Sequence, residues 1–111
     1  MIQRVLVMTV LLTVAAFLEV GGDALVRVGL GHAGAQRIWY FAFGAVVLFA
    51  YGVFVNTAPA DFGRLLGIYV VLFFIVAQVV NFVAFRVAPS PSILVGGVFI
   101  IIGGAVMTAW T

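Results

Sequence analysis

Reactive side chains are scarce in this chain of 111 residues. It has no cysteine, which excludes disulfide bridges and thiolate chemistry. With one histidine, His32, and no cluster of acids, the usual ligands of a metal site are missing as well. We find no phosphate-binding loop and no Ser/His/Asp set in the sequence. We therefore expect no enzyme, no cofactor and no metal.

Charge is scarce too, at 7% of the chain against roughly a quarter in an ordinary soluble domain. There is no lysine, and the formal net charge is +2. The five arginines are Arg4, Arg27, Arg37, Arg64 and Arg86. Nucleic-acid-binding proteins gather such residues into a patch, whereas these are scattered. We therefore expect no nucleic-acid partner.

Apolar residues are abundant, at 67% of the chain. They form four runs, each near the ~20 residues that a spanning helix needs, at residues 5–26, 38–56, 65–85 and 93–110. All four are expected to be helices, because open strand edges cannot be satisfied in lipid. The sequence therefore predicts an all-α integral membrane protein. It forms a single domain of four transmembrane helices over residues 1–111, in contact with the lipid bilayer.

Turn and capping signals separate the four runs. We expect the glycine-rich residues 29–34 to form a loop. Asp61 and Arg64 are expected to cap or anchor the third helix. Ser90 followed by Pro91 is typical of a helix start, with a capping hydroxyl and a proline at the first helical position.

Glu19 is the residue that most needs an explanation, because it lies inside the first run. An ionised carboxylate is expensive in hydrocarbon, so an acid there is by default a functional-site hypothesis. Loss of water favours the neutral form of a carboxyl group, which allows proton loading and unloading. The deprotonated form can hold a cation. We interpret Glu19 as a residue that binds protons and substrate; the alternative is an interfacial acid neutralised by Arg27.

Other polar residues fall near Glu19 or on the third run. Asp23 follows Glu19 by one helical turn on the same face. It either joins the binding site or pairs with Arg27 at i,i+4, and we favour the ion pair. Gln78 and Asn81 are amides that we expect to hydrogen-bond another helix; the alternative is a place along the substrate path.

Aromatic residues supply further candidates for substrate binding. Tyr69 and Phe73 lie on one stripe of the third run, where they either pack or bind organic cations by cation–π attraction. Tyr51, in the middle of the second run, needs a partner for its hydroxyl group. That partner would be Glu19 or a backbone carbonyl.

Glycine pairs recur in the chain. In the fourth run, Gly96 and Gly97 are repeated seven residues later as Gly103 and Gly104, which places small residues on one stripe. We interpret this stripe as a dimer interface, in preference to packing within one chain. The Gly21–Gly22 pair either packs against a helix or makes room for substrate beside the preceding acid.

The arginines are divided almost evenly across the expected membrane. Four spans place Arg4 and Arg64 on one side, with Arg27, Arg37 and Arg86 on the other. Orientation requires an excess of Lys/Arg on one side, and the free amino terminus could level this count. We therefore expect copies to insert in both orientations and to pair antiparallel. An in-plane two-fold axis would then supply the inverted repeat that transporters use for alternating access.

Length, four short spans and one glutamate inside the first span together resemble the small multidrug resistance superfamily, most closely its YnfA-type branch. The residues that carry the resemblance are Leu18, Glu19, Val20, Gly21 and Gly22, then Pro59, Gly63, Arg64 and Tyr69, and finally Gly97 and Gly104. The resemblance covers nearly the whole chain. One departure is the third run, which lacks the tryptophan of the export members.

This resemblance implies a proton-coupled antiporter in the bacterial plasma (inner) membrane. It would work as an antiparallel dual-topology homodimer and export small organic cations, such as multidrug or guanidinium-like compounds. Glu19 of both chains would form the shared site, the second and third helices would line it, and the glycines of the fourth would form the dimer contact. A heterodimer is an alternative assembly. Alternative functions are a flippase or transporter of a lipid-linked or polar metabolite, and a membrane interaction subunit that does not transport.

Overall fold

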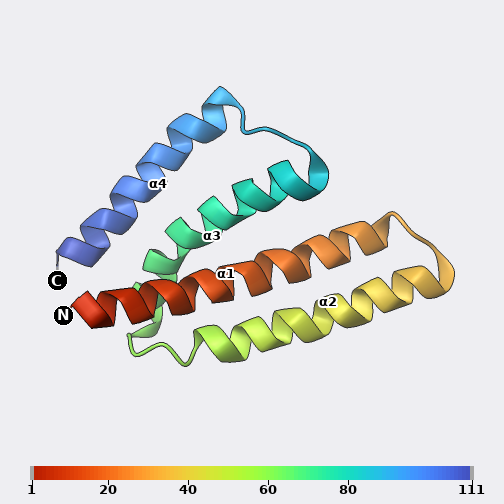
Figure 1. The fold of residues 1–111 in the computed structure, drawn as a ribbon, viewed down its shortest axis with the longest axis horizontal. Helices are drawn as coiled ribbons and strands as arrows, with labels where there is room; N and C mark the ends of the chain where they lie inside the picture. Colours follow the sequence, from red (N-terminus) through yellow and green to blue (C-terminus); the bar gives the residue numbers. More distant parts are fainter. Residues whose placement is uncertain (1, 111) are drawn as a thin grey trace.

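The computed structural model describes residues 2–110, and these form four helices (Figure 1). They are α1 (Ile2–Leu30), α2 (Gly34–Val55), α3 (Phe62–Phe85) and α4 (Pro91–Ala109). All four are long and apolar enough to cross a membrane. The prediction of an all-α chain with four spans is confirmed, and the protein is a multi-pass integral membrane protein in a lipid bilayer.

The connection between α1 and α2 is shorter than we predicted. Of the expected loop at residues 29–34, Gly29 still belongs to α1 and Gly34 already begins α2. Gly29 is buried against α2, where an added Cβ would lie 2.8 Å from the Cβ of Tyr40 and 3.0 Å from the ring of Phe41. This glycine therefore serves close helix packing instead of a flexible turn, and that contact keeps α1 helical to its end.

The predicted helix starts are confirmed at α3 and α4. The Asp61 carboxylate accepts a hydrogen bond from the backbone N–H of Arg64 at 3.0 Å. The Ser90 hydroxyl accepts one from the backbone N–H of Ile93 at 3.3 Å, and Pro91 follows at the first helical position. Both caps satisfy an N–H group that a helix start leaves without a partner.

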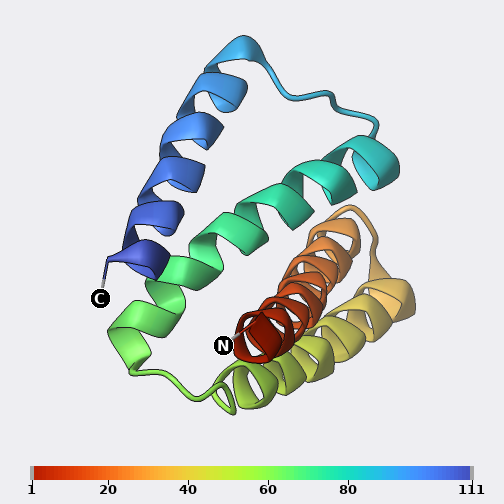
Figure 2. The same cartoon turned by 60° about the vertical axis from the view of Figure 1, so that its left-hand side comes forward.

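Helix α1 occupies the centre of the arrangement, with α2 packed on one side and α3 on the other (Figure 2). Helix α4 packs only against α3 among the described helices. The start of α1, the end of α4 and the α2–α3 connection lie at one end of the molecule, and the other two connections lie at the opposite end (Figure 1). This places the arginines on the two sides that the sequence predicts.

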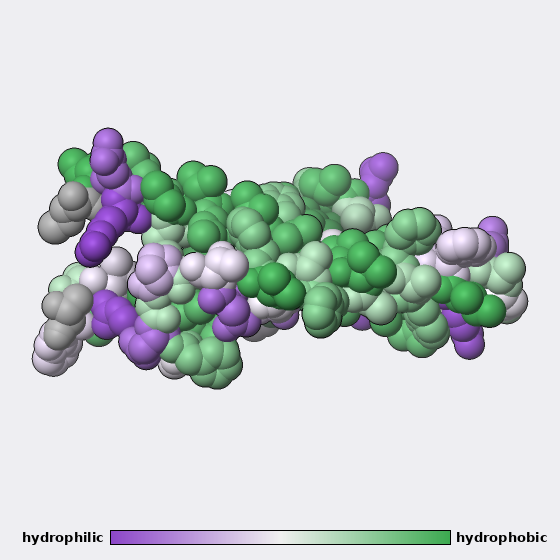
Figure 3. Space-filling view, turned by 90° about the horizontal axis from the view of Figure 1, so that it is seen from below, coloured by the Kyte–Doolittle hydropathy of each residue, from purple (hydrophilic) through white to green (hydrophobic). Residues whose placement is uncertain are grey.

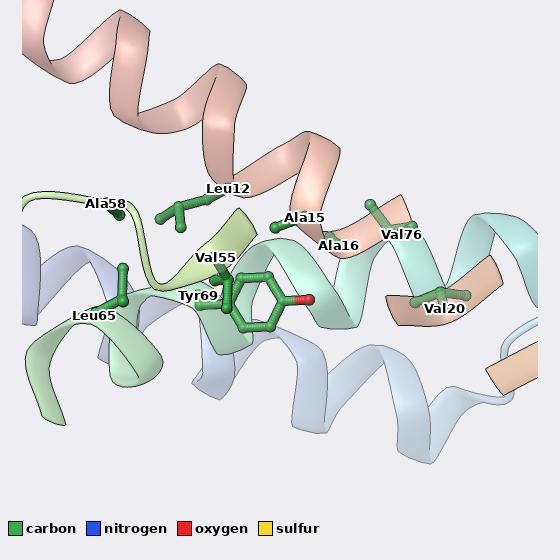
Figure 4. Close-up of a cluster of buried hydrophobic side chains, with 9 residues drawn as sticks. All are labelled: Leu12, Ala15, Ala16, Val20, Val55, Ala58, Leu65, Tyr69 and Val76. Atoms are coloured by element: carbon green, nitrogen blue, oxygen red, sulfur yellow. The ribbon is translucent and has the colours of Figure 1, made fainter. Parts of the chain in front are cut away.

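A small core joins α1, α2 and α3 (Figure 4). Ala15 and Ala16 are fully buried on α1, and their small side chains let the neighbouring helices approach. The other buried side chains are Leu12, Val20, Val55, Ala58, Leu65, Tyr69 and Val76. The face shown in Figure 3 is apolar over most of the middle of the long axis, with hydrophilic residues mainly toward the two ends. That distribution fits a bilayer around the middle.

Part of the predicted dimer stripe is used within the chain. An added Cβ on Gly97 would lie 2.6 Å from the Phe74 ring of α3, and one on Gly104 would overlap the Val71 side chain. These two glycines let α4 approach α3. The expectation that they form a dimer contact is therefore corrected to packing inside one chain.

The two remaining glycines of that stripe, Gly96 and Gly103, have nothing within 4 Å of an added Cβ. Neighbouring helix residues point about 100° apart, so Gly96 and Gly103 face a different direction from Gly97 and Gly104. The sequence spacing alone did not show which pair would meet α3. Only Gly96 and Gly103 leave α4 with a small-residue stripe that its own chain does not cover.

Candidate functional site

Glu19 and Tyr69 form the polar centre of the molecule. The Tyr69 hydroxyl on α3 donates a hydrogen bond to the Oε1 of Glu19 on α1 at 3.0 Å. Tyr69 is 4% exposed, so its ring is buried in the core and its hydroxyl is directed at the acid. Glu19 itself is half-buried. The carboxylate therefore has one fixed donor and keeps lone pairs free for a second partner.

Aromatic rings surround this hydrogen bond. Tyr51 of α2 stacks on Tyr69 with ring centroids 5.7 Å apart and planes at 29°. Phe73 lies one turn further along α3, with its centroid 6.1 Å from that of Tyr69. The fold thus brings together Glu19, Tyr51, Tyr69 and Phe73, which were separate candidates in the sequence. We call these four residues the Glu19 site.

The partner of Glu19 differs from the one considered in the sequence. We proposed Tyr51 as one source of a hydrogen bond to Glu19, whereas the bond that forms comes from Tyr69. Both tyrosines lie in apolar spans, and only the docking of α3 against α1 decides between them. The hydroxyl partner could not be read from helical spacing within a single element.

Asp23 lies outside the Glu19 site. It lines a cavity of about 360 Å³ between α1 and α3, together with Arg27, Gln78 and Asn81. The expected ion pair between Asp23 and Arg27 is absent from the part of the chain that the structure describes. The Arg27 guanidinium lies instead over the ring of Phe85, 5.9 Å from its centroid. Cation–π attraction and the position near the end of α1 account for this orientation.

The two amides of α3 also differ from expectation. We expected Gln78 and Asn81 to hydrogen-bond another helix, but within residues 2–110 their side chains form no hydrogen bond to protein. Both line the cavity with Asp23 and Arg27. The cavity adjoins the Glu19 site, because Phe73 lines the cavity and also packs on Tyr69.

The glycine pair after Glu19 has a divided role. An added Cβ on Gly22 would lie 2.7 Å from Leu48 of α2, so this glycine serves packing. Gly21 has nothing within 4 Å of an added Cβ and leaves space on the helix beside the acid. Packing therefore accounts for Gly22, whereas room for substrate beside the acid stays a prediction for Gly21.

The arrangement suits reversible ion binding. Over residues 2–110, no three His, Cys, Asp or Glu side chains gather into a group that could hold a metal ion. What the site offers is one carboxylate, one hydroxyl donor and aromatic faces within the membrane span. A carboxylate can take up either a proton or an organic cation, and aromatic faces attract cations.

Comparison with protein families gives a match over nearly the whole chain. The family described as "Uncharacterised BCR, YnfA/UPF0060 family" matches residues 5–111 of the chain. No curated protein and no solved structure matches the chain significantly.

Proposed function

We infer from its membership of the YnfA/UPF0060 family, which is related to the small multidrug resistance superfamily, that this chain is a small transporter-like membrane protein. We propose that it is a proton-coupled antiporter that exports small organic cations across the bacterial plasma membrane. The proposed cycle makes and breaks no covalent bond in the cargo, so the protein acts as a carrier and not as an enzyme.

The hydrogen bond from Tyr69 to Glu19 carries this proposal. It marks Glu19 as an acid held in a defined position within an apolar span. In the deprotonated state, the Glu19 carboxylate holds the cation, and the faces of Tyr51 and Phe73 contact its apolar parts. Protonation of the carboxylate removes the negative charge and releases the cation. Proton and cargo thus compete for one group, which couples their movements in opposite directions.

The working unit in this proposal is an antiparallel homodimer. In one chain Glu19 is only half-buried, and a second copy in the opposite orientation would enclose it. Exchange of conformations between the two copies would open the site alternately to each side of the membrane. Gly96 and Gly103 remain available on α4 for contact with the second copy.

Replacement of Glu19 by glutamine tests the mechanism. Glutamine keeps the size of the side chain and the hydrogen bond from Tyr69, but it neither takes up a proton nor carries a charge. We expect Glu19→Gln to abolish cation-driven proton flux in proteoliposomes, measured with a pH-sensitive dye against a panel of quaternary ammonium and guanidinium compounds.

The matched control is Asp61→Asn, because Asp61 is exposed at the start of α3 and asparagine caps helices equally well. We expect this variant to transport like the wild type. Undiminished proton-coupled flux in folded Glu19→Gln protein would refute the mechanism.

A further inference from the structure

The cavity between α1 and α3 contains two opposite charges that do not pair with each other. Asp23 and Arg27 both line it, and both are exposed toward it or toward solvent. No ion pair joins the two in the described chain, and Arg27 instead contacts Phe85. Because the two exposed charges are not paired with each other, both are available to a ligand that enters this cavity.

Two amides complete the polar lining of this cavity. Gln78 and Asn81 lie three residues apart on α3, so they share a face opposite Asp23 and Arg27. Without a protein partner among residues 2–110, they offer both donors and acceptors to whatever enters. The space of about 360 Å³ is large enough for a small ligand.

We propose that this cavity binds a small zwitterion, whose ammonium group contacts Asp23 and whose anionic group contacts Arg27. The two residues are four positions apart on α1, which separates them by about 6 Å along the helix axis. A simple cation would satisfy Asp23 but would be repelled by Arg27, and a simple anion would have the reverse difficulty. A ligand that carries both charges at about that spacing neutralises both residues.

The apolar part of the lining fits the linker of such a ligand. Phe73, Val80 and Phe85 lie in the same cavity as the two charges. A short methylene chain between the ammonium and the anion would contact these side chains. The same chemistry occurs in a soluble amino acid and in the ethanolamine phosphate headgroup of a membrane lipid, so the test must separate these two sources.

The proposed zwitterion site adjoins the Glu19 site and shares Phe73 with it, but Asp23 and Arg27 lie outside the Glu19 site, and binding to them does not require proton coupling. Its test is therefore equilibrium binding without a pH gradient, measured by isothermal titration calorimetry on purified protein in nanodiscs of phosphatidylglycerol. The probe is 4-aminobutyrate, compared with butylamine and butyrate, which each keep one of its two charged groups. We expect 4-aminobutyrate to bind at least tenfold more tightly than either.

Two neutral substitutions test the assigned contacts. Asp23→Asn and Arg27→Gln should each weaken 4-aminobutyrate binding at least tenfold, because each removes one counter-charge and keeps the side-chain size. The matched controls Asp61→Asn and Arg4→Gln, which do not line the cavity, should leave the binding unchanged.

Nanodiscs of phosphatidylethanolamine distinguish the two sources. Loss of 4-aminobutyrate binding there would identify the lipid headgroup as the occupant, and unchanged binding would identify a soluble zwitterion. The proposal is overturned by absent binding in phosphatidylglycerol, by equal binding of butylamine and 4-aminobutyrate, or by unchanged binding in both cavity variants. None of these results depends on the outcome of the Glu19→Gln transport assay.

Discussion

Single polar residues determine which ligands the membrane-spanning part of this protein can bind. Glu19 stands out in the sequence because few charges fall within the apolar spans. Its environment, in contrast, is a product of the fold: Tyr69 comes from a position 50 residues further along the chain and supplies the hydrogen bond. A glutamate in an apolar helix predicts a binding site, but which hydroxyl group donates a hydrogen bond to it depends on how the helices pack.

Removal of the Tyr69 hydroxyl tests the contribution of that bond. A hydrogen bond to a charged group contributes about 1.5–3 kcal/mol and favours the deprotonated carboxylate over the protonated one. In Tyr69→Phe, protons should therefore compete better with the cation for Glu19, and apparent cation binding should weaken roughly tenfold or more. The ring, its stack on Tyr51 and its burial are retained, so the fold should persist. The measurement is the concentration of cation that gives half-maximal proton flux.

Tyr40→Phe is the matched control, because Tyr40 lies near the end of the molecule, where its ring packs on His32 at 4.9 Å. It removes the same hydroxyl group far from Glu19 and should leave the half-maximal concentration unchanged. Equal values for wild type and Tyr69→Phe would show that the hydrogen bond does not contribute to cargo binding.

The individual helices were largely predictable from the sequence, and their contacts were not. Apolar runs and the caps at Asp61 and Ser90 locate α3 and α4 to within a few residues. The glycine repeat in the fourth run indicates a close helix contact. Glycines spaced seven residues apart can, however, pack against a helix of the same chain or of another chain equally well. The fold assigns Gly104 to α3 and leaves Gly103 open.

That difference predicts opposite outcomes for two neighbouring substitutions. Gly104→Ala places a methyl group into Val71, and overpacking of this kind costs about 1–3 kcal/mol. Gly103→Ala meets nothing within 4 Å and gains helix propensity, so the monomer should be as stable as the wild type or slightly more stable. The free energy of unfolding in an SDS titration in mixed micelles measures both effects. Equal destabilisation by the two substitutions would contradict the packing of α4 on α3.

At the scale of the whole molecule, the fold confirms the predicted division of the arginines between the two ends. It does not test the antiparallel dimer. The helix ends in Figure 1 place Arg4 and Arg64 at one end, and Arg27, Arg37 and Arg86 at the other. Composition and span number are enough to predict this division. The assembly stays a prediction that rests on the charge balance and the glycine stripe, because the contacts of a second copy would depend on surfaces that only the folded chain defines.

The near balance of charge makes orientation sensitive to one residue. Gln3 and Gln36 are both exposed and lie at opposite ends of the molecule. Gln3→Lys and Gln36→Lys should therefore shift the population in opposite directions, because a cytoplasmic location of added lysine is favoured. Paired C-terminal reporters, one active on each side of the membrane, measure the ratio.

Wild-type protein should give comparable signals from the two reporters. The two lysine variants form their own control, since they make the same chemical change on opposite sides. A wild-type signal from one side only, or a shift in the same direction for both variants, would contradict dual topology.

The position of α4 has a consequence for how the protein is made. This helix follows the other three described helices in the chain and contacts only α3 among them. The Glu19 site and the neighbouring cavity are built entirely from α1, α2 and α3. During biosynthesis, every residue that one chain contributes to these two regions is therefore synthesised before α4. The docking of α4 onto α3 adds no residue to either region.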